Sequence, residues 1–167
     1  KGKSTLLNVL AGELHPVTGQ VKAHPSLQKG HFGQTNINRL HLKNTIIDEI
    51  SESNPALGTS GVRGICGAML FSGDKAEKKI DVLSGGERSR VLLGKILAHP
   101  TNLLILDEPT NHLDMESIEI LTEEIKAYKG ALIIVTHSEE LLRNVVTKLI
   151  VFRNDKAEIF NGNYREF

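Results

Sequence analysis

The sequence predicts an α/β fold in which a mostly parallel sheet is flanked by helices, and three observations lead to this prediction. Residues 103–106 and 131–135 are short apolar runs, as expected for strands buried on both faces. Between them, residues 118, 121, 125 and 128 place apolar side chains at helical spacing. Because strands that alternate with helices form βαβ units, these strands are expected to run parallel.

The remaining elements follow in chain order. A helix is expected after residue 5 and is expected to end at Gly12. Asp114 is expected to cap a helix that runs through Tyr128. Other helices are expected at residues 45–50, 62–71, 88–98 and 141–146, with a loop at 51–61. Strands are expected at residues 19–22 and 30–32, and a hairpin at 149–152 and 157–160 around Asn154 and Asp155.

Length and composition indicate one globular unit, because 167 residues can bury one sizeable core. The formal net charge is zero, which points to neither nucleic acid nor a membrane surface. The single cysteine, Cys66, allows no disulfide within the chain and fits a reducing compartment. The sequence contains no signal peptide and no apolar stretch of membrane-spanning length, so a cytoplasmic location without membrane insertion is expected.

Two carboxylates, Asp107 and Glu108, directly follow the apolar run at 103–106. Open α/β sheets bind ligands at the carboxyl ends of their strands. One acid at such a place can hold a metal ion, and a second can act on a water molecule. Pro109 then turns the chain into a loop. The pair therefore predicts a nucleotide-hydrolysing site.

The first residues, Lys1 to Thr5, match the second half of the phosphate-binding loop G-x-x-x-x-G-K-[ST]. In such a loop Gly2, Lys3, Ser4 and Thr5 stand at a helix N-terminus, where free N–H groups and the helix dipole attract phosphate. The lysine neutralises phosphate charge, and the serine hydroxyl binds Mg²⁺. A solvated basic terminus is the alternative. The first glycine of the loop is missing, so the chain is expected to be a fragment that begins inside this motif.

Three further groups stand where the predicted topology brings ligand-binding residues. Ser84, Gly85 and Gly86 precede a helix and can form an anion site, although an ordinary glycine loop is the alternative. Gln34 follows a strand and can bind Mg²⁺ or a water, although a lone glutamine is more often surface. His137 follows the run at 131–135, at the same sheet edge as the acid pair. Each signal alone is weak, but their order and spacing are specific.

Taken together, these motifs resemble those of an ABC ATPase domain, a P-loop NTPase, over essentially the whole chain. Gly2 to Thr5 match the Walker A loop, Gln34 the Q-loop, and residues 83–87 the signature. Residues 106–110 match Walker B, and Asp114 and His137 match the D-loop and H-loop. The sequence is also similar to the ABC-F branch of soluble, tandem-domain translation factors, because it reads LSGGERSR and DEPTNHLD.

The resemblance implies one partial ABC ATPase domain, with an α/β core at 1–34 and 100–167 and a helical subdomain with the signature at 35–99. It implies ATP and Mg²⁺ as cofactors. Lys3 would hold the β- and γ-phosphates, and Mg²⁺ would be positioned by Ser4, Gln34 and Asp107. Glu108 would be the general base, His137 would contact the γ-phosphate, and Gln34 would assist. Ser84, Gly85 and Gly86 would reach the ATP of a second ABC domain, with Asp114 at the seam.

Three functions follow from these observations. The first is an ABC-F protein that acts as an ATP-driven clamp on the ribosome, with any rRNA or tRNA contacts made by parts outside this chain. The second is the ATPase subunit of an ABC membrane transporter. The third, a catalytically silent binding module, is disfavoured because Lys3, Asp107, Glu108 and His137 are all present. A coiled-coil chromosome-maintenance ATPase is excluded, because residues 34–84 leave no room for a long coiled coil.

Overall fold

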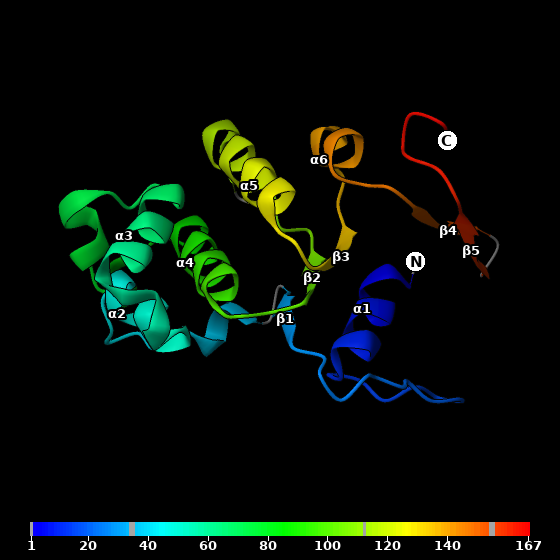
Figure 1. Cartoon of the computed structure of the whole chain (residues 1–167), viewed down its shortest axis with the longest axis horizontal. Helices are drawn as coiled ribbons and strands as arrows, with labels where there is room; N and C mark the ends of the chain where they lie inside the picture. The colour runs from blue at the N-terminus through cyan, green and yellow to red at the C-terminus, as the bar shows by residue number, and fades with distance from the viewer. Residues whose placement is uncertain (1, 34–35, 112, 154–155) are drawn as a thin grey trace.

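A computed structural model describes residues 2–33, 36–111, 113–153 and 156–167. Three parallel strands form the central sheet in the order β1 (Lys29–Phe32), β2 (Leu103–Asp107), β3 (Ala131–Val135). Phe32 pairs with Leu106, and Leu106 pairs with Ile134. The register places the carboxyl ends of all three strands at one edge. The predicted parallel α/β core is therefore confirmed (Figure 1).

Helices cover both faces of this sheet. α1 (Lys3–Ala11) packs against β2 and β3, while α4 (Gly85–Ala98) packs against β1 (Figure 1). Side chains of β2 alternate between the two faces. Leu104 and Leu106 join the large apolar cluster with α4 and α5 (Met115–Ala127), whereas Ile105, also fully buried, faces the other way. β2 is therefore buried on both sides, as its unbroken apolar run predicts.

Residues 36–98 are built of helices and turns in the described part of the chain. α2 (Ile46–Ser53), α3 (Gly58–Ala68) and α4 pack on one another at the left of Figure 1. Buried Ile46, Ile50 and Leu93 lie in the shared core, and burying each such side chain contributes about 1.5–3 kcal/mol. Four 3₁₀ turns complete this region: η1 (Asn36–Arg39), η2 (Pro55–Leu57), η3 (Gly73–Glu77) and η4 (Ile80–Val82).

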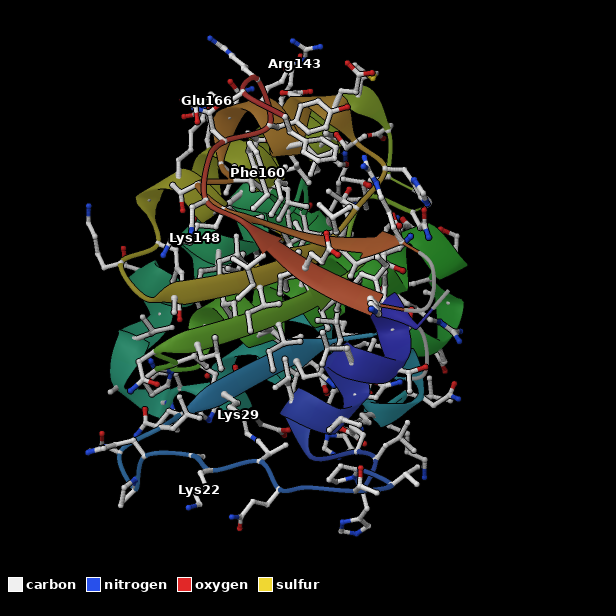
Figure 2. The ribbon with its side chains drawn as sticks, turned by 90° about the vertical axis from the view of Figure 1, so that its right-hand side faces the viewer. Lys22, Lys29, Arg143, Lys148, Phe160 and Glu166 are labelled. Atoms are coloured by element: carbon white, nitrogen blue, oxygen red, sulfur yellow. The ribbon has the colours of Figure 1, made fainter. Side chains whose placement is uncertain are left out.

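The chain ends in a smaller unit beside α1. α6 (Glu139–Asn144) packs against α5 and is followed by an antiparallel hairpin of β4 (Leu149–Arg153) and β5 (Lys156–Phe160). The hairpin confirms the prediction, although its expected turn at 154–155 lies outside the described residues. Figure 2 shows the hairpin crossing near α1, with Phe160 at its end. None of the helices in the described ranges is long and apolar enough to cross a membrane.

One predicted strand is wrong. Residues 19–22 form no strand, and residues 17–25 are exposed. Figure 2 shows Lys22 on an extended segment set apart from β1, which carries Lys29. An extended segment becomes a strand only where a neighbouring strand accepts its backbone hydrogen bonds, and the described residues offer none here.

Four helices start earlier than predicted, among them α1 at Lys3 and α6 at Glu139. α4 begins at Gly85 rather than at residue 88, because Ser84 and Glu87 form a capping box. The Ser84 hydroxyl accepts a hydrogen bond from the Glu87 N–H at 3.3 Å, and a Glu87 carboxylate oxygen accepts from the Ser84 N–H at 2.8 Å. α3 begins at Gly58 rather than at residue 62, directly after η2, which shortens the predicted loop at 51–61.

Candidate functional site

The first turn of α1 is open to solvent. Gly2 caps the helix with φ of 91°, a left-handed conformation that favours glycine, and Lys3, Ser4 and Thr5 are exposed. Leu7, only 2% exposed, anchors the opposite face of the helix in the interior. A glycine cap has no side chain with which to satisfy the N–H groups of the first turn. These groups and the helix dipole are therefore available to an anion such as phosphate.

Asp107 stands at the carboxyl end of β2 and is only 9% exposed. Its Oδ1 is buried and has no hydrogen-bond partner among the described residues. A buried carboxylate oxygen without a partner is costly, unless a cation or a water lies beside it. Mg²⁺ prefers oxygen ligands, so this orphaned atom fits a magnesium site.

Glu108 is held in an unusual conformation next to Asp107. Its φ of 51° lies in the left-handed region, which costs a residue with a side chain about 1–3 kcal/mol. The surrounding hydrogen bonds fix this turn: the Glu108 N–H donates to the Val135 carbonyl at 2.8 Å, and the Asn111 N–H donates to the Glu108 carbonyl at 3.1 Å. Strain of this kind is concentrated at functional sites, where it orients a side chain.

Glu108 and His137 lie in contact. The His137 N–H donates to Glu108 Oε2 at 3.2 Å, and His137 Nε2 lies 3.4 Å from Oε1. The Glu108 side chain is 13% exposed, whereas that of His137 is 85% exposed. The carboxylate is therefore aimed from β2 toward the end of β3, and the imidazole stands free to meet a ligand. The sequence predicted that these two residues share one sheet edge, and the geometry agrees.

Asp114 caps α5 and links it to α4. Its Oδ1 accepts a hydrogen bond from the Ser117 N–H at 2.9 Å, and its Oδ2 lies 3.8 Å from Arg90 Nη1. Hydrogen bonds from the side chain and backbone of Ser117 lower the pKa of Asp114. The predicted cap is confirmed, and the loop that follows Glu108 is thereby tied to the helix that carries Ser84.

Ser84 and Gly85 are exposed at the N-terminus of α4, and Gly86 is half-buried. A Cβ at Gly85 would meet no atom within 4 Å, so the space beside this backbone is open to a ligand. The backbone hydrogen bond from Ser84 is the main cause of the lowered pKa of Glu87, which keeps the capping box charged.

The predicted site residues do not all lie on one side of the sheet. α1 packs against the two strands that lead to Glu108 and His137, whereas α4 lies across the sheet from α1 (Figure 1). Ser84 therefore belongs to a different face from Lys3. Gln34 lies outside the described residues, but β1 ends at Phe32, which pairs with Leu106 next to Asp107.

The sequence predicted His31 only as part of a strand. In the structure, its side chain lies in a cluster of polar residues. Its side chain is 8% exposed, and Nδ1 lies 3.6 Å from Glu13 Oε1 and 3.4 Å from Asn36 Nδ2. Burial lowers the pKa of His31. Arg39 donates to both oxygens of Glu13 at 2.7 and 2.9 Å and lowers the pKa of that carboxyl. In the sequence, the only indication of this polar cluster was a histidine inside a short strand that precedes Gln34.

Comparisons with known proteins identify the family of the chain. A family model described as "ABC transporter" matches residues 1–111, and the chain belongs to this family. It is 39% identical over 167 residues to the "Probable ATP-binding protein YbiT" of Escherichia coli O157:H7, covering 99% of this chain and 32% of that protein. It is 36% identical over 166 residues to the mouse (Mus musculus) "ATP-binding cassette sub-family F member 3", covering 99% of this chain and 23% of that protein.

These relatives are members of the ABC-F branch, so the resemblance to that branch is confirmed. The chain spans about a third or less of their length. Among solved structures, it matches an archaeal ribosome recycling factor, aABCE1, crystallised with ribosomal stalk protein aP1, with a TM-score of 0.81. That match covers 99% of this chain and 33% of the other at 24% sequence identity, and so it supports the fold alone.

Proposed function

We propose that this chain is one ABC ATPase domain of an ABC-F protein, which binds and hydrolyses ATP together with a second ABC domain and acts on the ribosome in translation. The catalytic part of the proposal rests on the buried Oδ1 of Asp107, which has no hydrogen-bond partner within the described part of the chain, and on the contact between Glu108 and His137 beside it. In this proposal residues 1–34 and 100–167 are the α/β core, and residues 35–99 are the helical subdomain.

ATP would bind with its phosphates at the first turn of α1. The N–H groups after Gly2 would donate to the phosphate oxygens, with Thr5 in the same turn, and Lys3 would neutralise β- and γ-phosphate charge. Ser4, Gln34 and Asp107 would hold Mg²⁺, which supplies charge neutralisation on the phosphoryl oxygens. The exposure of Lys3 and Ser4 leaves both side chains free for these roles.

Glu108 would orient the attacking water and accept its proton as the water oxygen bonds to the γ-phosphorus and ADP leaves. The left-handed turn and the N–H of His137 hold the carboxylate in place for this step. The exposed imidazole of His137 would contact the γ-phosphate, and Gln34 would help to place the water. Preorganised groups of this kind contribute most of the rate acceleration in phosphoryl transfer.

Each nucleotide would lie between two domains. Ser84, Gly85 and Gly86 stand at the N-terminus of α4, the helix that lies across the sheet from α1, so they would reach an ATP that is bound by the partner domain rather than by Lys3 (Figure 1). Asp114 would lie at the seam, since it connects the Glu108 loop to α4 through Arg90. ATP binding would then close the two domains, and hydrolysis would release them.

The proposed role on the ribosome is supported by the relatives of this chain, which are ABC-F proteins. The chain itself has zero net charge, so contacts with rRNA or tRNA would come from other parts of the full-length protein. Such a protein would work in the cytoplasm, without inserting into a membrane.

The test is Glu108→Gln in the full-length protein. We expect ATP binding to be retained and turnover to fall by about 10²–10⁴-fold, because the base is removed while the shape is kept. The ATP-loaded variant should also co-sediment with ribosomes. Glu116→Gln, an exposed glutamate in the first turn of α5, is the matched control and should leave both measurements unchanged. Undiminished hydrolysis would refute the role of Glu108. Lost turnover without ribosome binding would refute the translational role and favour a transporter subunit.

A further inference from the structure

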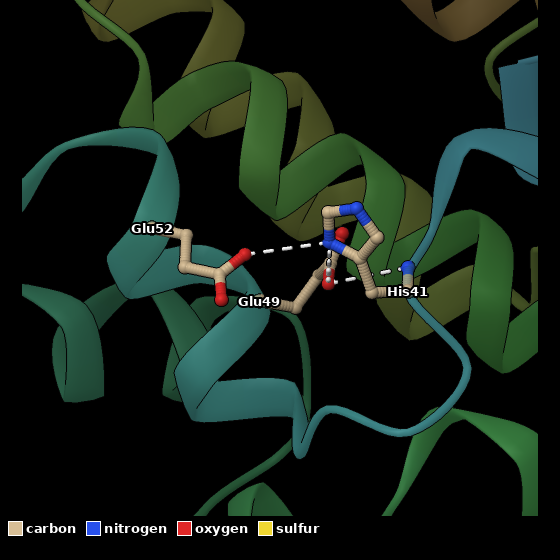
Figure 3. Close-up of side chains that lie close together, drawn as sticks. All are labelled: His41, Glu49 and Glu52. Carbon is tan, nitrogen blue, oxygen red and sulfur yellow. Dashed lines mark hydrogen bonds and ion pairs between the residues drawn. The ribbon is translucent and has the colours of Figure 1, made fainter.

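A second group of ligand-type side chains lies in the helical region, away from the proposed ATP site. His41, in the loop that follows η1, faces Glu49 and Glu52, which stand three residues apart on α2 (Figure 3). One atom from each residue lies within 4.8 Å of the other two. His41 Nδ1 is 3.4 Å from Glu49 Oε2 and 3.3 Å from Glu52 Oε2.

His41 Nδ1 thus lies between two carboxylate oxygens at nearly equal distances, each longer than a strong hydrogen bond. A charged N–H donor lies about 2.7–2.9 Å from a carboxylate oxygen, and Nδ1 carries at most one proton for two carboxylates. The distances also match those between two ligands of one ion. Nitrogen and oxygen ligands about 2.0–2.1 Å from a tetrahedral Zn²⁺ stand about 3.3 Å apart.

Glu49 is held firmly in the orientation that such a site requires. Its side chain is fully buried, and Lys95 Nζ donates to Oε1 at 2.5 Å. Asn44 Nδ2 donates to Oε2 at 3.0 Å, and the His41 N–H donates to the same oxygen at 3.3 Å. Contacts that fix a ligand's orientation are what make a metal site selective and tight.

Charge and access also suit a divalent cation. Glu49 and Glu52 carry two negative charges, Lys95 offsets one of them, and a neutral imidazole adds no charge. His41 and Glu52 are 66% and 53% exposed, so an ion can enter from solvent and keep a water as its fourth ligand. Imidazole combined with carboxylates favours zinc and its first-row neighbours over Ca²⁺ or Mg²⁺, which prefer oxygen alone.

We propose that His41, Glu49 and Glu52 bind a Zn²⁺ ion that fastens the loop after η1 to α2. The site is separate from the proposed Mg²⁺ site at Asp107 and does not depend on the proposed ATPase function. The loop after η1 is also hydrogen-bonded to residues 80–81, which precede the signature. The Ile80 N–H donates to the Asn44 carbonyl at 3.0 Å, and the Asp81 N–H donates to the Leu42 carbonyl at 3.1 Å. Zinc would thus stiffen the loop on which residues 80–82 rest.

The test is zinc titration of the full-length protein by calorimetry. The protein is first stripped with a chelator, and ZnCl₂ is added in millimolar Mg²⁺ without nucleotide. His41→Ala and Glu52→Gln are compared with His99→Ala and Glu77→Gln, which change exposed residues of the same types outside the cluster. Because both ligand variants alter exposed side chains, they are expected to fold, and circular dichroism checks this.

The expected result is one Zn²⁺ per chain that is lost, or bound at least tenfold more weakly, in His41→Ala and Glu52→Gln alone. Co²⁺ in place of Zn²⁺ should give the intense visible absorption of a four-coordinate site in the wild type and both controls. The proposal is overturned if the wild type binds no zinc, or if the two ligand variants bind it as tightly as the controls do. ATP turnover is not measured, so neither result bears on the role of Glu108.

Discussion

Asp107→Asn is expected to stabilise the nucleotide-free protein while removing its response to Mg-ATP. Asp107 is 9% exposed, and its buried Oδ1 has no partner among the described residues. An unsatisfied buried group costs about 1–3 kcal/mol. Asparagine removes the charge but keeps a polar side chain, so we take the lower end, about 1 kcal/mol in the free energy of unfolding. For a domain of this length, that change raises Tm by about 2–4 °C.

Thermal unfolding by calorimetry, with and without Mg-ATP, measures both effects. A ligand at 100 times its Kd stabilises the folded state by about 2.7 kcal/mol, so the wild type should gain about 5–10 °C. Asp107→Asn should gain little. Asp81→Asn, an exposed aspartate in η4, is the control and should behave like the wild type. A lower Tm without nucleotide, together with an undiminished gain from Mg-ATP, would show that Oδ1 of Asp107 holds no cation.

Two further predictions concern packing and pH. Gly94→Ala should lower the free energy of unfolding by about 1 kcal/mol in urea titration. Its Cβ would lie 3.0 Å from Met69 Cγ and 3.2 Å from Ile50 Cδ1, an overpacking that costs about 1–3 kcal/mol, and the better helix propensity of alanine inside α4 offsets about 0.5–1 kcal/mol of this cost; an unchanged midpoint would contradict this tight contact. His31 has a pKa lowered by burial from its ordinary value of 6.5, so the unfolded chain binds its proton first. The stability that the neutral His31 side chain contributes is fully present above pH 6.5. It is lost as the pH falls through the pKa of His31 in the folded state, which is the lower of the two. His31→Gln should flatten this part of a stability–pH profile, and an identical slope would refute the assignment.

The sheet and its acid pair could be predicted because their signals are local. The apolar run at 103–106 indicates a strand buried on both faces, and Asp107 with Glu108 must then stand at its end. Asp114 as the cap of α5 follows from its own side-chain chemistry. Such features depend on residues that are close in sequence, so no knowledge of the packing is needed.

Features that depend on distant partners were missed or wrong. The expected strand at 19–22 has the composition of a strand, but no described residue pairs with it. His31 resembles any strand residue until the fold brings Glu13 and Asn36 to its ring. The early start of α4 differs from these, because Ser84 followed by Glu87 is a local capping signal that could have been recognised in the sequence.

The hairpin also has a consequence for when the first turn of α1 is completed during synthesis. A Cβ atom at Gly2 would lie 3.7 Å from Cε1 of Phe152, so a ring from β4 lies beside the start of α1. At about 5–20 residues per second, a ribosome makes these two residues about 8–30 s apart. For that interval the start of α1 lacks this aromatic neighbour, and until residues 103–135 are made it also lacks the strands on which α1 packs. The start of α1 would therefore reach its native surroundings late, after the hairpin has emerged and folded back.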